Sequence, residues 1–156
     1  MSIEIERKFL VLDDSYKEGA TPVRIVQGYI CSSEEKVVRV RIKGERAYLT
    51  LKDSTVGFSR HEFEYQIPAA DARTMIDTMC DGEVIDKTRW VVDFGGYTWE
   101  VDEFHGDNQG LVVAEIELEH ADAKFDLPDW IGREVTGEER YYNACLYRCP
   151  YTRWNL

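Results

Sequence analysis

The sequence contains few of the residues that bind transition metals. Its four cysteines form no CxxC pair, and its three histidines are scattered along the 156 residues. Zinc sites need cysteine and histidine ligands at characteristic spacings, so this distribution argues against one. We expect the cysteines to be buried, reduced thiols.

Long apolar segments are also missing. The chain contains no apolar run of about 18 residues, the length typical of a membrane-spanning helix, and no signal-peptide pattern. No linker, repeat or low-complexity tract divides it. We therefore expect a cytoplasmic protein that binds no membrane and folds as one domain over residues 1–156.

Basic residues are in the minority. Acidic residues outnumber them 30 to 19, which gives a net charge of −11. This balance disfavours binding of nucleic acid or an anionic membrane through the whole surface. It does not exclude an anion site inside the protein, because such a site depends on the local arrangement. An acidic total beside clustered arginines and lysines fits a partner that arrives with metal cations.

The pattern of the remaining residues is that of a β protein. Segments rich in β-branched and aromatic residues, separated by turn signals at 43–46, 95–97 and 105–110, predict eight strands. These cover residues 2–10, 23–31, 36–43, 47–53, 59–67, 83–93, 97–104 and 111–120. We expect a mainly β (α+β) fold, an eight-stranded antiparallel closed or nearly closed β-barrel with a few short helices. A β-sandwich is the alternative.

Two segments break the strand pattern. Apolar residues at helical spacing predict a helix over 69–80, with Asp81 and Gly82 as its stop. The same spacing predicts a second helix over 137–148, begun by a capping box of Thr136 and Glu139.

Charged residues recur on one face of seven of the strands. Glu4, Glu6 and Lys8 stand two residues apart and therefore share a face of the first strand. The other strands repeat this spacing, with apolar residues between the charges. Their charged residues are Arg39 and Arg41, Lys52, Glu62 and Glu64, Lys87 and Arg89, Glu100 and Asp102, and Glu115, Glu117 and Glu119.

These faces have two interpretations. An antiparallel sheet often exposes a polar face to water. Here, however, the strands are sorted by sign, and like charges two apart repel unless an opposite charge lies between them. Seven such strands indicate a shared, charge-lined cavity. Arginine and lysine bind phosphate oxygens, and carboxylates without histidine or cysteine suit Mg²⁺ or Mn²⁺. The expected occupant is a metal–polyphosphate complex.

The residues also resemble a known family. Glu4-x-Glu6-x-Lys8 resembles the ExExK signature of the CYTH domain, the triphosphate tunnel metalloenzymes. The resemblance continues in order through the charged pairs above and ends in residues 127–137, where Arg133 stands at the late basic position. It implies an eight-stranded tunnel that binds a triphosphate together with divalent metal. The chain looks most like the compact bacterial group that hydrolyses inorganic tripolyphosphate.

The resemblance, together with the chemistry of the residue types, assigns expected roles. Phosphate oxygens would be held by Lys8, Arg39, Arg41, Lys52, Lys87, Arg89 and Arg133. Metal would be held by Glu4, Glu6, Glu115 and Glu117. Supporting roles fall to Glu62, Glu64, Glu100, Asp102 and Glu119. The expected catalytic residues are Lys8, Arg39, Glu117 and Tyr29, the last because family members have a tyrosine there that is suggested as a proton acceptor. A hydrogen-bonded barrel residue is the alternative for Tyr29.

Several alternatives stay open at this point. The same fold carries adenylate cyclases of class IV type and thiamine triphosphatases, and action on nucleoside triphosphates beside tripolyphosphate is compatible with the pattern. A polyphosphate- or nucleotide-binding module is the non-enzymatic alternative, although pure anion binding would not need the acids. The sequence does not decide the preferred metal or the number of metals, and it leaves a homodimer open.

Overall fold

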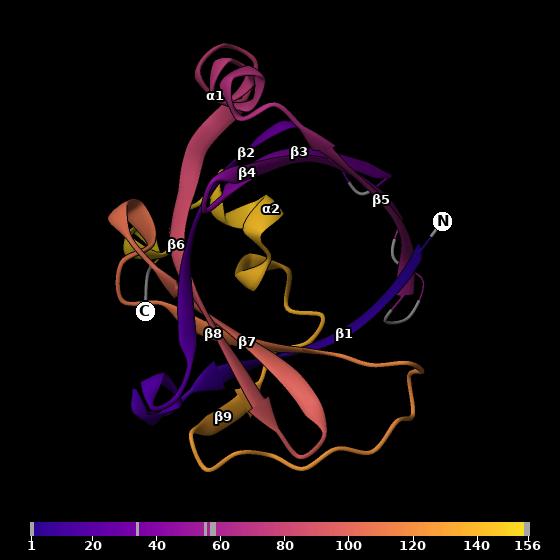
Figure 1. Cartoon of the computed structure of the whole chain (residues 1–156), viewed down its shortest axis with the longest axis vertical. Helices are drawn as coiled ribbons and strands as arrows, with labels where there is room; N and C mark the ends of the chain where they lie inside the picture. The colour runs from indigo at the N-terminus through magenta and orange to yellow at the C-terminus, as the bar shows by residue number, and fades with distance from the viewer. Residues whose placement is uncertain (1, 34, 55, 57–58, 155–156) are drawn as a thin grey trace.

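The described residues form a single sheet of nine strands. The computed structural model describes residues 2–33, 35–54, 56 and 59–154, with side chains from residue 5 onward. The strands are β1 (Ser2–Val11), β2 (Thr21–Ser32), β3 (Lys36–Lys43), β4 (Arg46–Asp53), β5 (Ser59–Ile67), β6 (Asp81–Phe94), β7 (Tyr97–Phe104), β8 (Val112–Glu117) and β9 (Ile131–Glu134). Figure 1 looks into the ring that β1 to β8 form.

The ring is a closed antiparallel barrel. Its strands follow the order β5-β4-β3-β2-β6-β7-β8-β1, and a pairing of β5 with β1 closes it. Within the ring, strand β1 pairs with two neighbours, because residues 2–5 pair with β5 and residues 6–10 pair with β8. The short β9 pairs with the end of β1 and is not needed for closure. The predicted eight-stranded barrel is confirmed, and the alternative β-sandwich is wrong.

All eight predicted strands are present, with bounds that differ by a few residues. The predicted turn at 95–97 is a tight hairpin in which Phe94 pairs with Tyr97. Gly95 and Gly96 have φ values of 62° and 82° there, which side chains with a Cβ rarely adopt. The segment 105–110 also connects two strands as predicted and contains the short 3₁₀ helix η2 (Gly106–Asn108). Strand β9 was not predicted, because four residues carry too little pattern.

The first predicted helix is confirmed as α1 (Ala69–Thr78). It lies outside the barrel, where Ala72 and Ile76 pack on Val40 and Ala47 of β3 and β4. Its predicted stop is wrong, because the helix ends at Thr78 with Met79 as its C-cap, and the Asp81–Gly82 pair already belongs to β6.

The second predicted helix is wrong as a continuous element. The segment instead forms the 3₁₀ helix η3 (Glu139–Tyr141) and the single turn α2 (Asn143–Leu146), separated by an extended Tyr142. The capping box is absent as well. The Thr136 hydroxyl accepts a hydrogen bond from the backbone nitrogen of Lys8 and donates one to Glu134, so it is committed to other partners.

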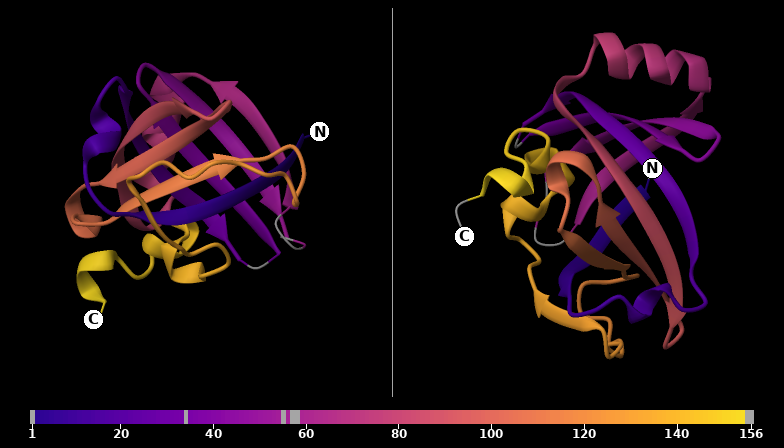
Figure 2. Two further views of the ribbon diagram at one scale, coloured as in Figure 1. Left: turned by 90° about the horizontal axis from the view of Figure 1, so that it is seen from below. Right: turned by 90° about the vertical axis from the view of Figure 1, so that its left-hand side faces the viewer.

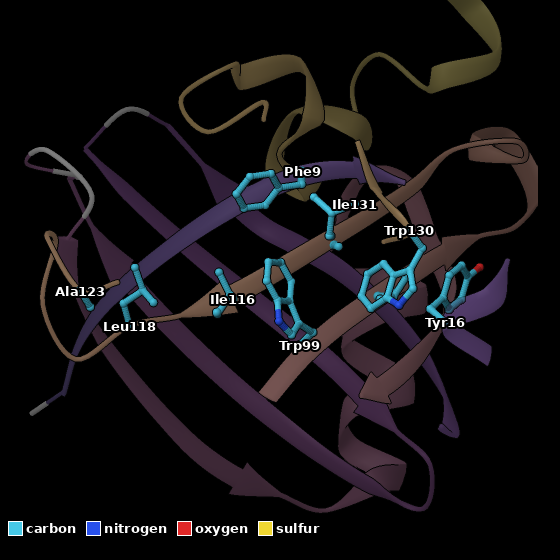
Figure 3. Close-up of a cluster of buried hydrophobic side chains, with 10 residues drawn as sticks. Phe9, Tyr16, Trp99, Ile116, Leu118, Ala123, Trp130 and Ile131 are labelled. Carbon is cyan, nitrogen blue, oxygen red and sulfur yellow. The ribbon is translucent and has the colours of Figure 1, made fainter. Parts of the chain in front are cut away.

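Apolar residues pack on the outside of the barrel and at one of its ends. Figure 3 shows the largest outer cluster, in which Trp99 of the wall packs against Trp130 from the connection between β8 and β9 and has Ile116 on its other side. Tyr16, from the 3₁₀ helix η1 (Ser15–Lys17), joins it. A second cluster joins the ends of several strands to the C-terminal segment, including Leu146 and Tyr147. This segment, with the 3₁₀ helix η4 (Tyr151–Arg153) near its end, therefore covers one end of the barrel (Figure 2). Among the described helices, none is long and apolar enough to cross a membrane.

We expect Trp99→Ala to lower the free energy of unfolding by about 3–5 kcal/mol, because Trp99 is fully buried in the outer cluster and leaves a large cavity. Phe63→Ala is the matched control. Phe63 also points outward from the wall but is 39% exposed, so its loss should cost about 1 kcal/mol or less. Urea denaturation of both variants measures the difference, and equal losses would show that the outer cluster does not stabilise the wall.

Candidate active site

A charged cavity of about 240 Å³ lies inside the barrel. Six basic side chains line it: Lys8, Arg39, Arg41, Lys52, Arg60 and Arg89. Five acidic side chains line it as well: Glu6, Glu62, Glu100, Glu115 and Glu117. The structure therefore gathers most of the predicted charged residues around one space, as the period of two along each strand requires.

Strand β3 contributes two arginines to one wall of the cavity. Arg39 and Arg41 point inward from β3, while Val40 between them packs outward against α1. Register places Arg39 opposite Thr50 of β4, and Thr50 opposite Glu64 of β5. The side chains follow this line, because Arg39 donates to the Thr50 hydroxyl at 3.3 Å and Thr50 donates to Glu64 at 3.2 Å. Arg39 is thereby held in place from one side.

Carboxylates gather on the facing strands. Register places Glu6 of β1 opposite Glu117 of β8, and Glu115 opposite both Lys8 of β1 and Glu100 of β7. Lys8 Nζ lies 3.2 Å from Glu115. Burial by itself would raise the pKa of Glu115, but Lys8 and Arg89 lower it to about 2. Like charges at opposed strand positions weaken the pairing unless a cation lies nearby, so this wall suits cations.

A buried carboxylate supports the basic side chains from behind. Asp102 accepts hydrogen bonds from Arg89 Nε at 2.8 Å and Nη2 at 3.0 Å, and from Lys87 Nζ at 2.7 Å. Lys87 is fully buried and also donates to Asn143 at 2.9 Å. Burial lowers the pKa of Lys87 to about 7, whereas Arg89 and Lys87 hold the pKa of Asp102 well below its usual range. Asp102 therefore fixes one edge of the Arg89 guanidinium, and the remaining Nη1 donates to Glu100 of the cavity lining at 3.2 Å.

Two guanidinium groups lack the partners that a buried cation needs. Arg39 Nε is buried and has no hydrogen-bond partner among the described residues. Arg41 makes no ion pair within the described part of the chain, and its Nε donates to the neutral Gln27 at 2.8 Å. Burial and the neighbouring Arg39 and Arg89 lower the pKa of Arg41 to about 9. Among the side chains that the structure describes, the charge of Arg39 is matched only by the half-exposed Glu64 at 3.8 Å. Buried cations whose charge is not fully matched are costly, so this wall is arranged for an anion that comes from outside.

Comparison with known proteins identifies the fold. Residues 2–143 match the CYTH domain. The chain belongs to the CYTH domain family. It is 50% identical over 151 residues to the inorganic triphosphatase of Acetivibrio thermocellus, covering 97% of each chain. A crystal structure of the inorganic triphosphatase NE1496 superposes with a TM-score of 0.66 at 32% identity, over 94% of this chain and 95% of that one. The PH1012 protein of Pyrococcus horikoshii OT3, with a TM-score of 0.59 at 20% identity over 76% and 81% of the two chains, shares the fold.

The C-terminal segment completes the lining of this CYTH domain. Thr136, Gly137, Tyr142, Asn143 and Ala144 all face the cavity. The Tyr142 ring lies 5.0 Å from Lys8 Nζ, a cation–π contact that helps to orient the ammonium group. None of these residues was predicted, because none belongs to a charged stripe. Arg60 was also missed, although it stands in phase with Glu62 and could have been found from that spacing.

Tyr29 lies in the cavity wall, where it is 2% exposed and its ring stacks on Tyr147 at 4.9 Å. Its hydroxyl accepts a hydrogen bond from Gln27 Nε2 at 2.9 Å. The strand pairing is irregular here, because the register of β2 shifts next to Tyr29 against both β3 and β6. Such irregularities re-aim side chains and are common beside active sites.

Some predicted site residues do not line the cavity of the CYTH domain. Lys87 and Asp102 lie behind it, and Glu64, with 40% of its side chain exposed, reaches only Arg39 and Thr50. Arg133 is more than half exposed and pairs with Glu138, and the exposed Glu119 accepts a hydrogen bond from Tyr97. The expectation that these two belong to the charge-lined tunnel does not agree with these positions, because β9 lies outside the wall and Glu119 follows the end of β8. The side chain of Glu4 lies outside the described residues.

The acidic wall fits a hard divalent cation. No group of three acidic, histidine or cysteine side chains converges on one point among the described residues, so they form no complete metal cage of their own. Mg²⁺ is usually held by one or two carboxylates together with waters and substrate phosphates. The opposed Glu6 and Glu117, with Glu115 beside them, match that requirement. Carboxylate oxygens suit Mg²⁺, Mn²⁺ and Ca²⁺, so these ligands do not by themselves select one of the three metals.

We expect Asp102→Asn to lower the free energy of unfolding by about 3–5 kcal/mol, because it removes the buried carboxylate that Lys87 and Arg89 share as a counter-charge. Glu100→Gln is the matched control. Glu100 also contacts Arg89, at 3.2 Å, but 36% of its side chain is exposed, so the loss should stay below about 1 kcal/mol. Urea denaturation at neutral pH measures both.

The same variant has an expected pH dependence. The pKa of Asp102 is lower in the folded protein than in the unfolded chain. Its stabilising contribution is therefore complete above the unfolded value of about 4 and is lost as the pH falls below it. The gap between the native protein and Asp102→Asn should narrow in acid, and a constant gap would contradict the ion-pair assignment.

Proposed function

We propose that the protein hydrolyses inorganic tripolyphosphate to pyrophosphate and phosphate inside this cavity, with a divalent metal ion. The observation that carries the proposal is the pair of buried arginines, Arg39 and Arg41, which have unused capacity for an anion and face a wall of carboxylates. The identity of 50% to an inorganic triphosphatase over nearly the whole chain supports the same activity. A small-molecule phosphate compound is accordingly the proposed partner.

The basic side chains of the cavity would bind and orient the substrate. Arg39 and Arg41, with Lys8, Lys52 and Arg89, present donors for several phosphate oxygens in one cavity. These donors are fixed before the substrate arrives, because Asp102 and Thr50 hold two of the guanidinium groups. Preorganised cations stabilise the charge that spreads over the phosphoryl oxygens in the transition state. Lys8 and Arg39 would have this catalytic role, and Lys87 would support Arg89 through Asp102.

Charge balance favours a metal-dependent reaction. The basic and acidic side chains of the lining nearly cancel, so a polyanion alone would leave the cavity strongly negative. The metal would be held by Glu4 and Glu6 of β1 and by Glu115 and Glu117 of β8. When bound, Mg²⁺ or Mn²⁺ would offset the negative charge of the substrate phosphates. The carboxylates would also keep their basic neighbours in position.

A substrate and metal panel tests the function. We expect rapid release of orthophosphate from tripolyphosphate with Mg²⁺ or Mn²⁺, slower turnover of ATP and thiamine triphosphate, and no turnover after exhaustive EDTA treatment. Excess Ca²⁺ should inhibit, because its looser geometry misplaces the phosphates that Mg²⁺ aligns. Formation of cyclic AMP and pyrophosphate from ATP would favour a cyclase instead. Binding of tripolyphosphate without any turnover would favour a binding module.

Two substitutions should distinguish the role of the basic side chains from that of the acidic side chains. Arg39→Ala should raise KM and also lower kcat, with a loss in kcat/KM of about 100-fold or more, because its cation contacts the anion in both ground and transition states. Glu117→Ala should mainly lower kcat and should be partly rescued by a higher metal concentration.

The exposed hairpin variants Arg46→Ala and Glu45→Ala are the matched controls and should change kcat/KM less than twofold. Steady-state kinetics across a metal titration, with thermal melts, measures these effects. Unfolding of both cavity variants would show that Arg39 and Glu117 are structural.

A further inference from the structure

Gln27 of β2 is a fully buried amide that does not line the cavity but contacts two residues that do. It lies directly opposite Arg41 on β3, and Tyr29 lies opposite Arg39 in the same pair of strands. Gln27 Oε1 accepts from Arg41 Nε at 2.8 Å, and its Nε2 donates to the Tyr29 hydroxyl at 2.9 Å. Both ends of one neutral side chain are therefore used within the site.

The direction of these two hydrogen bonds is fixed by chemistry. A guanidinium nitrogen can only donate, so the amide oxygen must face Arg41. The amide nitrogen then faces Tyr29 and can only donate to its oxygen. Rotation of the amide by half a turn would oppose two donors at Arg41 and leave a buried cation without an acceptor, which is costly. Arg41 thereby sets the orientation of Gln27.

The orientation of Gln27 determines what Tyr29 can do. Its hydroxyl oxygen already accepts a hydrogen bond, and among the described residues the hydroxyl has no acceptor for its own proton. Burial raises the pKa of Tyr29 in spite of the nearby Arg39, Arg41 and Lys8 and the Gln27 hydrogen bond, so the phenol keeps that proton. Since Tyr29 lines the cavity, the proton is available to the occupant of the cavity.

We propose that Gln27 is a positioning residue that, locked by Arg41, presents the Tyr29 hydroxyl as a hydrogen-bond donor to a phosphate oxygen of the bound substrate. Tyr29 then acts as a donor, in contrast to the proton acceptor that the family resemblance implies. The inference rests on the proposed function for the identity of the anion. The arrangement also couples Arg41 to Tyr29 through Gln27, because a movement of Arg41 would release Gln27 and with it the tyrosine hydroxyl.

A double-mutant cycle tests this coupling. The variants are Gln27→Met, which removes both amide groups at similar volume, Tyr29→Phe, which removes only the hydroxyl, and their combination. The first readout is the affinity of tripolyphosphate in EDTA by calorimetry, which needs no turnover. The second is the split between kcat and KM with Mg²⁺. The surface variant Gln109→Met makes the same chemical change far from the cavity and should leave both readouts unchanged.

We expect each single variant to weaken metal-free tripolyphosphate binding about three- to tenfold and to lower kcat by a similar factor, with melting temperatures close to that of the native protein. In the Tyr29→Phe protein, adding Gln27→Met should cost less than about half of its single effect, because the hydroxyl through which Gln27 acts is already gone. Losses that multiply would overturn the proposal, and so would a Gln27→Met protein that binds and reacts like the native one.

A second substitution covers the case in which Gln27→Met does not fold. Gln27→Glu has the same shape but can only accept, so it would turn the Tyr29 proton away from the cavity while still pairing with Arg41. Its effect on binding should be at least threefold larger with Tyr29 present than in the Tyr29→Phe protein, and equal effects would overturn the proposal. If the native protein binds tripolyphosphate but hydrolyses nothing, the proposed function is refuted. The double-mutant cycle on tripolyphosphate affinity would still test the role of Gln27.

Discussion

The interior of this barrel is charged, and this constraint determines where the rest of the stability must come from. An eight-stranded barrel is just wide enough for side chains to fill its interior or for one small ligand, and here the lining includes six basic and five acidic groups. The apolar clusters therefore lie elsewhere. One packs outside the wall around Trp99, one lies under α1 around Val40, and one joins an end of the barrel to the C-terminal segment. The connection between β8 and β9 and the helices thus supply the burial that the interior cannot.

Within the lumen, the charges are held by neutral or oppositely charged groups that do not themselves reach the cavity. Asp102 holds Arg89 and Lys87, Thr50 joins Arg39 to Glu64, and Gln27 holds Arg41 and Tyr29. These supports fix the direction of each cation without neutralising all of its charge. A site of this kind is destabilising while empty, because desolvation is only partly compensated. The same incompleteness is what makes it complementary to a polyanion.

The sequence predicted the wall of the barrel well because period-two alternation is a strong signal. The alternation in β3 places Arg39 and Arg41 on one face of the strand and Val40 on the other. The sorting of charges by sign then indicated that the charged face points into the barrel. Gln27 gave no such signal, since its role depends on Arg41, which strand pairing brings opposite to it.

The helical spacing in residues 137–148 misled for a different reason. Leu146 is buried in a single helical turn. Tyr142, which precedes this turn, is extended and contacts Lys8 of β1, and a contact so distant in sequence leaves no local pattern. Arg133 was placed by its position in a family motif. Its strand, β9, lies outside the closed ring, and its guanidinium pairs with Glu138.

The seam of the barrel connects binding with folding. Strand β1 closes the ring through four residue pairs with β5, and along the rest of its length it sets Glu6 against Glu117 of β8. Carboxylates at opposed positions weaken strand pairing, and a cation between them strengthens it. Because ligands that bind only the folded state stabilise it, metal and phosphate would act on the strand that completes the barrel. The residues proposed for metal binding thus lie on the closing strand β1 and on its neighbour β8, and the same interactions serve the site and the fold.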